Sequence, residues 1–403
     1  MVARGVRAFV DGLVSVVLPG YLLLLGFDGV QVGAIVTGTL LGSAALTLAV
    51  GLGGHRVQRH VLLQAVALVM VGTGVAFGTL RWFWALLLVA AVGTLNPSAG
   101  DVSIFLPTEQ ALLPATTVDR QRTSLFGRYS FVGFCMAAFG ALASGLPDLL
   151  ARLTAVSRRD AFAGVFFVYA LAGAVVLLIY RRLTVDVGLS GEGATTALGP
   201  SRRLVYRLAA LFSLDSLGGG FVVQSLLVLW LFRRFGLSVT AAGAILFVAG
   251  LLSGASALLA APLARRIGLV RTMVFTHLPA NGLLVAAAFM PNVGSAVACL
   301  LLRGLVSQMD VPARTSYVMA VVRAAERPAA AAITNVPRSL ASALPPLAAG
   351  WMLDASTFGW PLVIAGTLKA AYDVILLVLF RNVRPPEEQV AHASSLPARP
   401  PAA

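Results

Sequence analysis

The chain has 403 residues, of which 58% are hydrophobic and 11% are charged. Soluble domains carry about 25% charged residues, so the composition excludes a soluble globular protein. The formal net charge of +14 does not indicate nucleic-acid binding, because the basic residues form no patch interleaved with aromatic residues. We expect anionic lipid headgroups to be the partner of this charge.

Apolar runs long enough to cross a bilayer recur along the whole chain. A transmembrane helix needs about 20 mostly apolar residues, and continuous Leu, Ala, Val and Gly runs favour helices over barrel strands, whose residues alternate. In chain order the predicted spans are 8–27, 30–53, 61–80, 83–106, 123–146, 161–180, 206–231, 239–261, 271–290, 293–313, 329–352 and 360–380. The sequence therefore predicts an all-α membrane protein with twelve transmembrane helices.

Two segments differ from these runs and divide the chain. Residues 183–204 are polar, and residues 385–403 are rich in Pro, Ala and Ser with little to bury. We expect a six-helix bundle over 1–182, a cytoplasmic linker over 183–204, a second six-helix bundle over 205–384 and a disordered cytoplasmic tail.

The two halves resemble each other in sequence. GAIVTGTLLGSAALTL at 33–48 aligns with GAILFVAGLLSGASAL at 243–258, an offset of 210. FVDGL at 9–13 aligns with SLDSL at 213–217, and DVS at 101–103 with DVP at 310–312. Matching charged positions are hard to obtain by chance in apolar sequence, so we expect two related bundles.

The basic residues also predict an orientation. When the loops are assigned to alternate sides, 19 of the 30 basic residues fall on the side of the two termini and six on the opposite side. Cytoplasmic loops carry an excess of Lys and Arg. We therefore expect a multi-pass protein of the cell's inner (plasma) membrane, with both termini cytoplasmic.

Two loops carry half-matching copies of one motif. GLGGHRVQRHVLL at 51–63 matches through Gly51, Arg56 and Arg59, and APLARRIGLVRTM at 261–273 matches through Arg266 and Gly268. In both copies the acidic residue is replaced, by His55 and by Arg265. The motif resembles the loop motif of the major facilitator superfamily. The organisation into six spans, a linker and six related spans resembles that family as well.

That resemblance implies a secondary transporter whose first, fourth, seventh and tenth helices line a central cavity. The acids Asp11, Asp101, Asp215 and Asp310 fall on those four helices, one on each. A charge inside a membrane is costly and often functional. One interpretation makes these acids proton-coupling residues; the alternative makes them salt bridges that hold the helices together.

Basic residues near these acids have two interpretations as well. Arg303 lies seven residues before Asp310, almost two helical turns, and is either a partner for a substrate anion or a charge that neutralises Asp310. Lys369 precedes Asp373 by four residues, which predicts a self-neutralising pair.

Two further arginines are candidates for a gate. Arg128 follows Asp101 by 27 residues, and Arg338 follows Asp310 by 28. We expect each acid to pair with its arginine near the cytoplasmic mouth and to stabilise one access state.

Enzyme motifs are missing from the sequence: it has no HExxH, GxSxG or GxGD, and Cys135 and Cys299 lie inside apolar spans. We expect no enzymatic activity, cofactor or metal. The predicted function is proton-coupled export of a small organic or drug-like compound by a monomer. Uptake by symport or uniport is the alternative, followed by a non-transporting receptor of the same fold.

Overall fold

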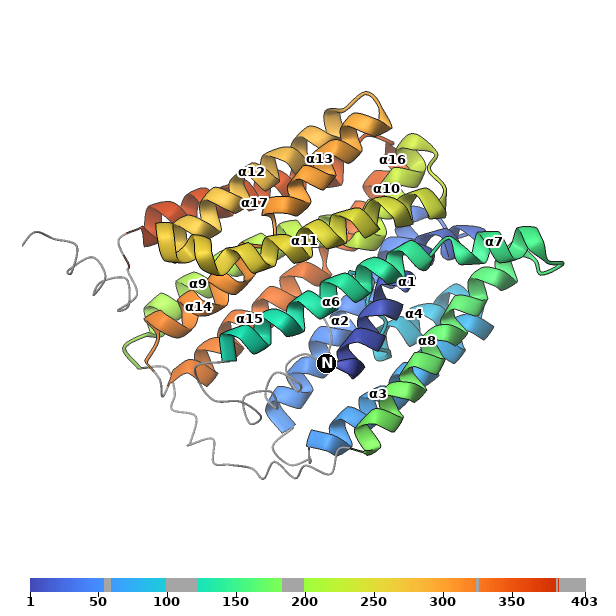
Figure 1. The fold of residues 1–403 in the computed structure, drawn as a ribbon, viewed down its shortest axis with the longest axis horizontal. Helices are drawn as coiled ribbons and strands as arrows, with labels where there is room; N and C mark the ends of the chain where they lie inside the picture. The colour runs from blue at the N-terminus through green and yellow to red at the C-terminus, as the bar shows by residue number, and fades with distance from the viewer. Residues whose placement is uncertain (54–58, 99–121, 183–198, 324–325, 382, 384–403) are drawn as a thin grey trace, which may run out of the picture.

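The computed structural model describes residues 1–53, 59–98, 122–182, 199–323, 326–381 and 383, and every regular element in these ranges is an α-helix (Figure 1). The first half contains α1 (Val2–Leu24), α2 (Gly29–Gly53), α3 (Arg59–Thr79), α4 (Phe83–Val92), α6 (Arg122–Ala143), α7 (Leu146–Leu153) and α8 (Arg158–Arg181).

The described part of the second half contains nine helices. They are α9 (Arg202–Phe221), α10 (Gln224–Phe235), α11 (Val239–Ile267), α12 (Leu269–Phe289), α13 (Val293–Val306), α14 (Asp310–Val321), α15 (Arg327–Ala343), α16 (Pro345–Ala355) and α17 (Trp360–Phe380). α9 begins inside the segment predicted to be the linker. Residues 183–198 and the tail from 384 lie outside the described residues.

Ten helical stretches of the described residues are long and apolar enough to cross a membrane. The shorter helix α4 stands in the place of the fourth predicted span, and the pair α15 and α16 stands in the place of the eleventh. This order agrees with the predicted twelve passes, and the predicted all-helical membrane fold is confirmed.

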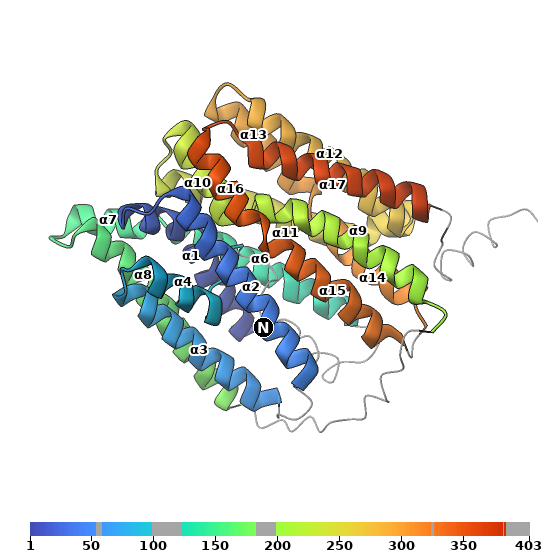
Figure 2. The same cartoon turned by 180° about the vertical axis from the view of Figure 1, so that it is seen from behind.

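Corresponding helices of the two halves pack in the same way. In the first half α1 packs on α6 and α8, α3 on α8, and α2 on α4. In the second half α9 packs on α15 and α17, α12 on α17, and α11 on α13. The sequence repeat is therefore repeated in three dimensions, and Figures 1 and 2 show the two sets of helices lying side by side.

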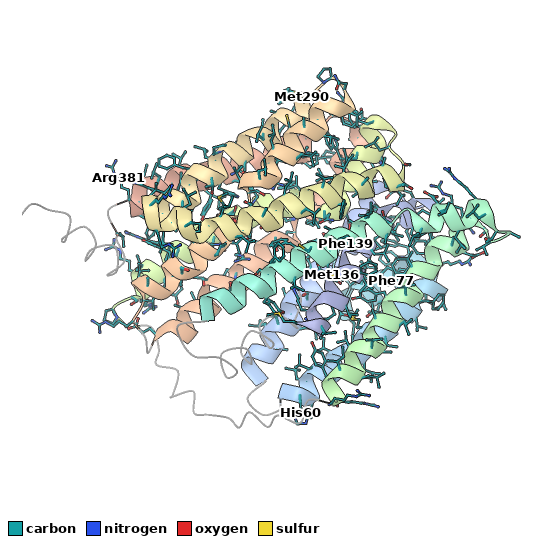
Figure 3. The ribbon with its side chains drawn as sticks, in the orientation of Figure 1. His60, Phe77, Met136, Phe139, Met290 and Arg381 are labelled. Carbon is teal, nitrogen blue, oxygen red and sulfur yellow. The ribbon has the colours of Figure 1, made fainter. Side chains whose placement is uncertain are left out.

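Among the described residues, the halves meet mainly where α2 packs against α15 and α16, α6 against α11, and α1 against α10. Phe139 of α6, which is labelled in Figure 3, packs on Phe247 of α11 with ring centroids 5.4 Å apart. Where α2 meets α16 the backbones come very close, since a Cβ on Gly350 would overlap the carbonyl of Gly29. A glycine is required at such an approach.

The two ends of the molecule differ in how the halves are packed. We call the end that holds the start of α1, the start of α9 and the end of α17 the terminal end, and the other the far end. One large buried cluster takes in residues of both halves, among them Tyr21, Phe166 and Trp230, whereas a second, around Phe212, Tyr317 and Tyr372, lies in the second half alone.

Candidate functional site

A cluster of buried charged side chains lies inside the second half, with Asp215 of α9 at its centre. Lys369 Nζ of α17 lies 2.7 Å from Asp215 Oδ1, and Arg314 Nη1 of α14 lies 2.9 Å from Asp215 Oδ2. All three side chains are at least nine-tenths buried. One carboxylate therefore joins three helices through two cations.

A histidine lies between this carboxylate and a second one. His277 of α12 has Nδ1 3.0 Å from Asp373 Oδ1 and Nε2 3.9 Å from Asp215 Oδ1. Asn281, one turn further along α12, donates from Nδ2 to Asp373 Oδ2 at 2.8 Å. Asp373 is fully buried and His277 nearly so. The imidazole thus contacts one carboxylate and faces another.

Two more charged residues complete the cluster. Asp310 of α14 lies 3.6 Å from Arg314 Nη2, one helical turn away. Arg303 of α13 is half-buried, and its Nε has no hydrogen-bond partner among the described residues. With a neutral histidine, Asp215, Asp310 and Asp373 balance Arg303, Arg314 and Lys369.

The balance explains how such a cluster exists inside a membrane protein. A buried pair gains little net stability over apolar residues, but removing one partner leaves an uncompensated buried charge and costs about 3–5 kcal/mol. The Arg314 guanidinium also lies 5.5 Å from the centre of the Phe212 ring, a cation–π distance. Asp215 has two cationic neighbours and Arg314 has two carboxylate neighbours, so the cluster is suited to exchanging a proton or an ion between partners.

The first half has a smaller polar centre around Asp11 of α1, which is buried. Asn96 Nδ2 lies 3.4 Å from Asp11 Oδ2. Arg7 and Arg4 precede Asp11 by four and seven residues and therefore lie on the same face of α1. The guanidinium of Arg4 packs 5.3 Å from the centre of the Tyr129 ring. Asp11 thus shares its helix face with two cations.

The halves are hydrogen-bonded to each other near these centres. Ser225, which follows the break between α9 and α10, has its hydroxyl 2.8 Å from the Ser15 carbonyl oxygen and its backbone N–H 3.1 Å from the Pro97 carbonyl oxygen. Both carbonyls belong to the first half, and Ser225 is fully buried. The N-terminus of α10 is thereby fixed to two segments of the first half.

Several sequence-predicted site residues are not tested by these contacts. Asp101 and Arg56 lie outside the described residues, as do the side chains of Arg59 and Arg128; Gly51 falls in α2. Arg338 is half-buried on α15, and its pairing with Asp310 stays a prediction.

The second copy of the loop motif has a clear backbone role. Arg266 is in the last turn of α11, and Gly268 joins α11 directly to α12 with φ +89°. Residues other than glycine rarely adopt that conformation. The glycine of the motif is therefore explained by the tight turn.

One predicted pair is wrong. Lys369 contacts Asp215 and not Asp373, whose partners are His277 and Asn281. The reason is that α17 packs against both α9 and α12, so each of its two buried charges finds a partner on a different neighbouring helix. His277 is not predicted as a site residue from the sequence, since the histidine stands alone in its apolar run.

Comparisons with known proteins agree with this architecture. The sequence model described as Major Facilitator Superfamily matches residues 208–402. The chain is 23% identical over 411 residues to "Uncharacterized membrane protein YJR124C" of Saccharomyces cerevisiae, covering 92% of this chain and 91% of that protein.

Solved structures share the fold over nearly the whole chain. The nucleoside transporter NupG superposes with a TM-score of 0.69 at 14% identity, covering 94% of this chain and 98% of NupG. A bacterial homolog of the human lysosomal transporter Spinster, in an inward-facing and occupied conformation, gives 0.70 at 15% identity, with 94% of each chain covered.

The fold and the match over the second half are those of multi-pass membrane transport proteins. The match to the Major Facilitator Superfamily model extends over the second half of the chain, and nearly the whole chain has the fold of the two solved transporters.

Proposed function

We propose that the chain is a proton-coupled secondary transporter that exports a small organic or drug-like compound by alternating access. The observation that carries this proposal is the position of His277 between Asp373 and Asp215. Histidine is the side chain that ordinarily gains and loses a proton near neutral pH. A proton on His277 changes the charge of a buried cluster that links α9, α12, α14 and α17.

The geometry supports a specific coupling step. Lys369 Nζ and His277 Nε2 both face Asp215 Oδ1, at 2.7 and 3.9 Å. Protonated His277 therefore competes with Lys369 for the same oxygen, while Arg314 keeps the other oxygen. In this proposal the competition weakens the contact between α9 and α17. A bias of about 5.5 kcal/mol is enough to move an access equilibrium from 1:99 to 99:1.

Arg303 supports an acidic or phosphate-bearing solute as the compound that is moved. Its Nε lacks a partner among the described residues, and guanidinium groups bind carboxylates and phosphates through paired hydrogen bonds. Asp11 and Asp310 complete the proposed set of coupling carboxylates, one in each half. We place the protein in the plasma membrane with both termini in the cytoplasm, which is supported by the excess of basic residues on the terminal side.

The experiment uses the purified full chain in proteoliposomes loaded with a pH-sensitive dye. Candidate solutes are first selected by thermal shift, because a ligand at 100 times its dissociation constant adds about 2.7 kcal/mol of stability. Nucleosides belong in that set because NupG is a nucleoside transporter. A selected solute should change the internal pH when it is added outside.

Matched variants separate proton coupling from transport itself. His277→Gln and Asp310→Asn should abolish solute accumulation driven by a pH gradient while leaving solute exchange down its own gradient. Asp160→Asn is the control, because Asp160 pairs with Arg81 at an exposed site of the first half. Unchanged pH-driven accumulation in both cluster variants would refute proton coupling through this cluster.

Direction is decided by which vesicle orientation accumulates the solute. Export predicts accumulation in inside-out vesicles when their lumen is acidic, and symport predicts accumulation in right-side-out vesicles when the outside is acidic. If the solute binds but crosses the membrane in neither orientation, the receptor alternative replaces transport.

A further inference from the structure

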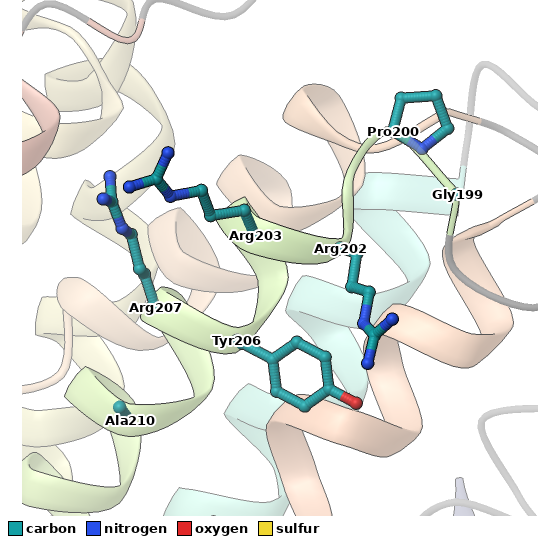
Figure 4. A pocket seen from close by; sticks show the side chains of 7 residues that line it. All are labelled: Gly199, Pro200, Arg202, Arg203, Tyr206, Arg207 and Ala210. Atoms are coloured by element: carbon teal, nitrogen blue, oxygen red, sulfur yellow. The ribbon is translucent and has the colours of Figure 1, made fainter.

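A basic cavity of about 610 Å³ lies at the terminal end of α9. It is lined by Gly199, Pro200, Arg202, Arg203, Tyr206, Arg207 and Ala210. Figure 4 shows the guanidinium groups of Arg203 and Arg207 close together on one side of the helix, with Arg202 next to Tyr206 on another. The cavity shares no residue with the Asp215 cluster.

The arginines that line this cavity form no ion pair among the described residues, and the carboxylate of Glu326 lies beside Gly199 at the edge of the cavity. Arg202, Arg203 and Arg207 are exposed, and none of the ion pairs among the described residues contains them. The guanidinium of Arg202 lies 5.7 Å from the centre of the Tyr206 ring. Three cations around one cavity, with no acidic residue in its lining, favour an anionic partner from outside the chain.

The position of the cavity identifies the kind of anion. The apolar helical stretch that starts at Arg202 is long enough to span the bilayer. Its first residues therefore lie at the level of the lipid headgroups, where Tyr is enriched and clustered basic residues attract anionic headgroups.

The remaining lining favours a ligand with an apolar part. Pro200, Ala210 and the ring of Tyr206 present carbon surface to the cavity beside the guanidinium groups. A free inorganic anion would use only the arginines. A phospholipid would place its phosphodiester on the guanidinium groups and its glycerol and first acyl carbons against the apolar lining.

We propose that this cavity binds the headgroup of an anionic phospholipid at the terminal side of the second half. Arg203 and Arg207 hold the phosphate, and Arg202, stacked on Tyr206, closes the other side. The site is independent of the proposed proton coupling, because it involves none of the same residues. In this proposal, part of the excess basic charge has a defined role, which is to bind a lipid headgroup.

The test measures lipid retention by the full chain in detergent, using native mass spectrometry with equal added concentrations of phosphatidylglycerol or phosphatidylcholine. The parent protein should retain phosphatidylglycerol preferentially. The variant R203Q/R207Q should bind it about 25-fold more weakly, at about five-fold for each basic residue near an anionic surface. The control R265Q/R266Q removes two exposed arginines from the end of α11, also at the terminal end, and should leave retention unchanged.

Two further arms separate a defined lipid site from a diffuse charge effect and from a site for a soluble anion. Tyr206→Ala should weaken phosphatidylglycerol binding whereas Tyr206→Phe should not, because the ring and not the hydroxyl contacts Arg202. Inorganic phosphate at millimolar concentration should not displace the lipid. Equal loss in R203Q/R207Q and R265Q/R266Q would show a diffuse charge effect and overturn the proposal. So would displacement by phosphate, which would indicate a soluble anion.

Folding of the variants is checked independently. All three arginines are exposed, so thermal unfolding of R203Q/R207Q in detergent without added lipid should match the parent. Addition of phosphatidylglycerol should raise the unfolding temperature of the parent and of R265Q/R266Q but not of R203Q/R207Q. An R203Q/R207Q protein that responds to the lipid like the parent would overturn the proposal.

Discussion

The carboxylate of Asp354 in the second half accepts a hydrogen bond of 2.9 Å from the backbone N–H of Gly29 in the first half. Its other oxygen accepts from the N–H of Val30 at 2.8 Å, and Arg233 Nη1 lies 2.6 Å from Asp354 Oδ1. One side chain at the end of α16 thus caps the N-terminus of α2 and binds α10. These contacts join the halves at the far end, so they must break before that end can open.

Replacing this carboxylate should shift the protein toward the state that is open at the far end. Asp354→Ala removes two hydrogen bonds to a charged group and one ion pair. Because the pair is about a quarter exposed, we expect a shift of about 1.4 kcal/mol, or about ten-fold. The readout is the labelling rate of Val36→Cys, a position fully buried between the halves, in a chain without Cys135 and Cys299.

Two control variants accompany this prediction, one that keeps part of the contact and one that lies away from it. Arg233→Gln leaves the cap on α2 and should have a smaller effect than Asp354→Ala. Asp160→Asn, at an exposed ion pair within the first half, should have none. Labelling of Val36→Cys at the parent rate in Asp354→Ala would show that the cap does not hold the far end closed.

The Asp215 cluster should be costly to break on one side. Lys369→Met leaves a buried carboxylate with one cation fewer, and we expect a loss of about 3–5 kcal/mol in the free energy of unfolding. The double variant Asp215→Asn with Lys369→Met should recover part of the loss, although Arg314 then lacks its closest carboxylate. Thermal unfolding in detergent is the measurement.

A surface ion pair provides the comparison for that series. Arg81 lies 3.0 Å from Asp160 within the first half and both side chains are half-exposed, so Arg81→Gln should have little effect on the free energy of unfolding. A Lys369→Met protein as stable as Arg81→Gln would mean that water reaches the cluster and screens its charges.

Gly268 should tolerate no side chain. Its φ of +89° and ψ of +160° lie in a region that is essentially restricted to glycine, and Gly268→Ala should destabilise by about 1–3 kcal/mol. Gly282 in the interior of α12 has open space around it, so Gly282→Ala should be neutral or stabilising by up to about 1 kcal/mol. Equal unfolding temperatures for the two variants would contradict the assigned turn.

The orientation is tested by reporter fusions after Gly191 and after Leu396. Both should report the cytoplasm, because 19 of the 30 basic residues lie on the same side as the termini. A periplasmic signal at either position would require an odd number of passes before it and would contradict twelve spans.

The predicted spans agree with the ten described helical stretches that are long and apolar enough to cross a membrane, because a span is a local property of composition and length. The sequence also selected Asp215, since the repeat aligns that residue with Asp11. The partners of Asp215 could not be predicted, because they depend on how each helix is rotated about its axis. A spacing of four residues on one helix predicted a pair between Lys369 and Asp373, but neighbouring helices offer both residues closer partners.

The partners of His277 could not be predicted from the sequence either. A single histidine in an apolar run has no spacing pattern, and only packing of α12 on α17 brings it to Asp373. Asp354 is similar: nothing in the sequence around it shows that it caps a helix more than 300 residues earlier in the chain.

The asymmetry of the buried core has a consequence for how the molecule comes apart. The cluster that includes Tyr21, Phe166 and Trp230 holds residues of both halves together, whereas the cluster around Phe212, Tyr317 and Tyr372 is confined to the second. Local opening follows such contiguous packing units. The border between the cooperative units therefore runs across the second half and not along the repeat boundary. We expect the amide exchange rates of α9 and α10 to differ more than the average rates of the two halves.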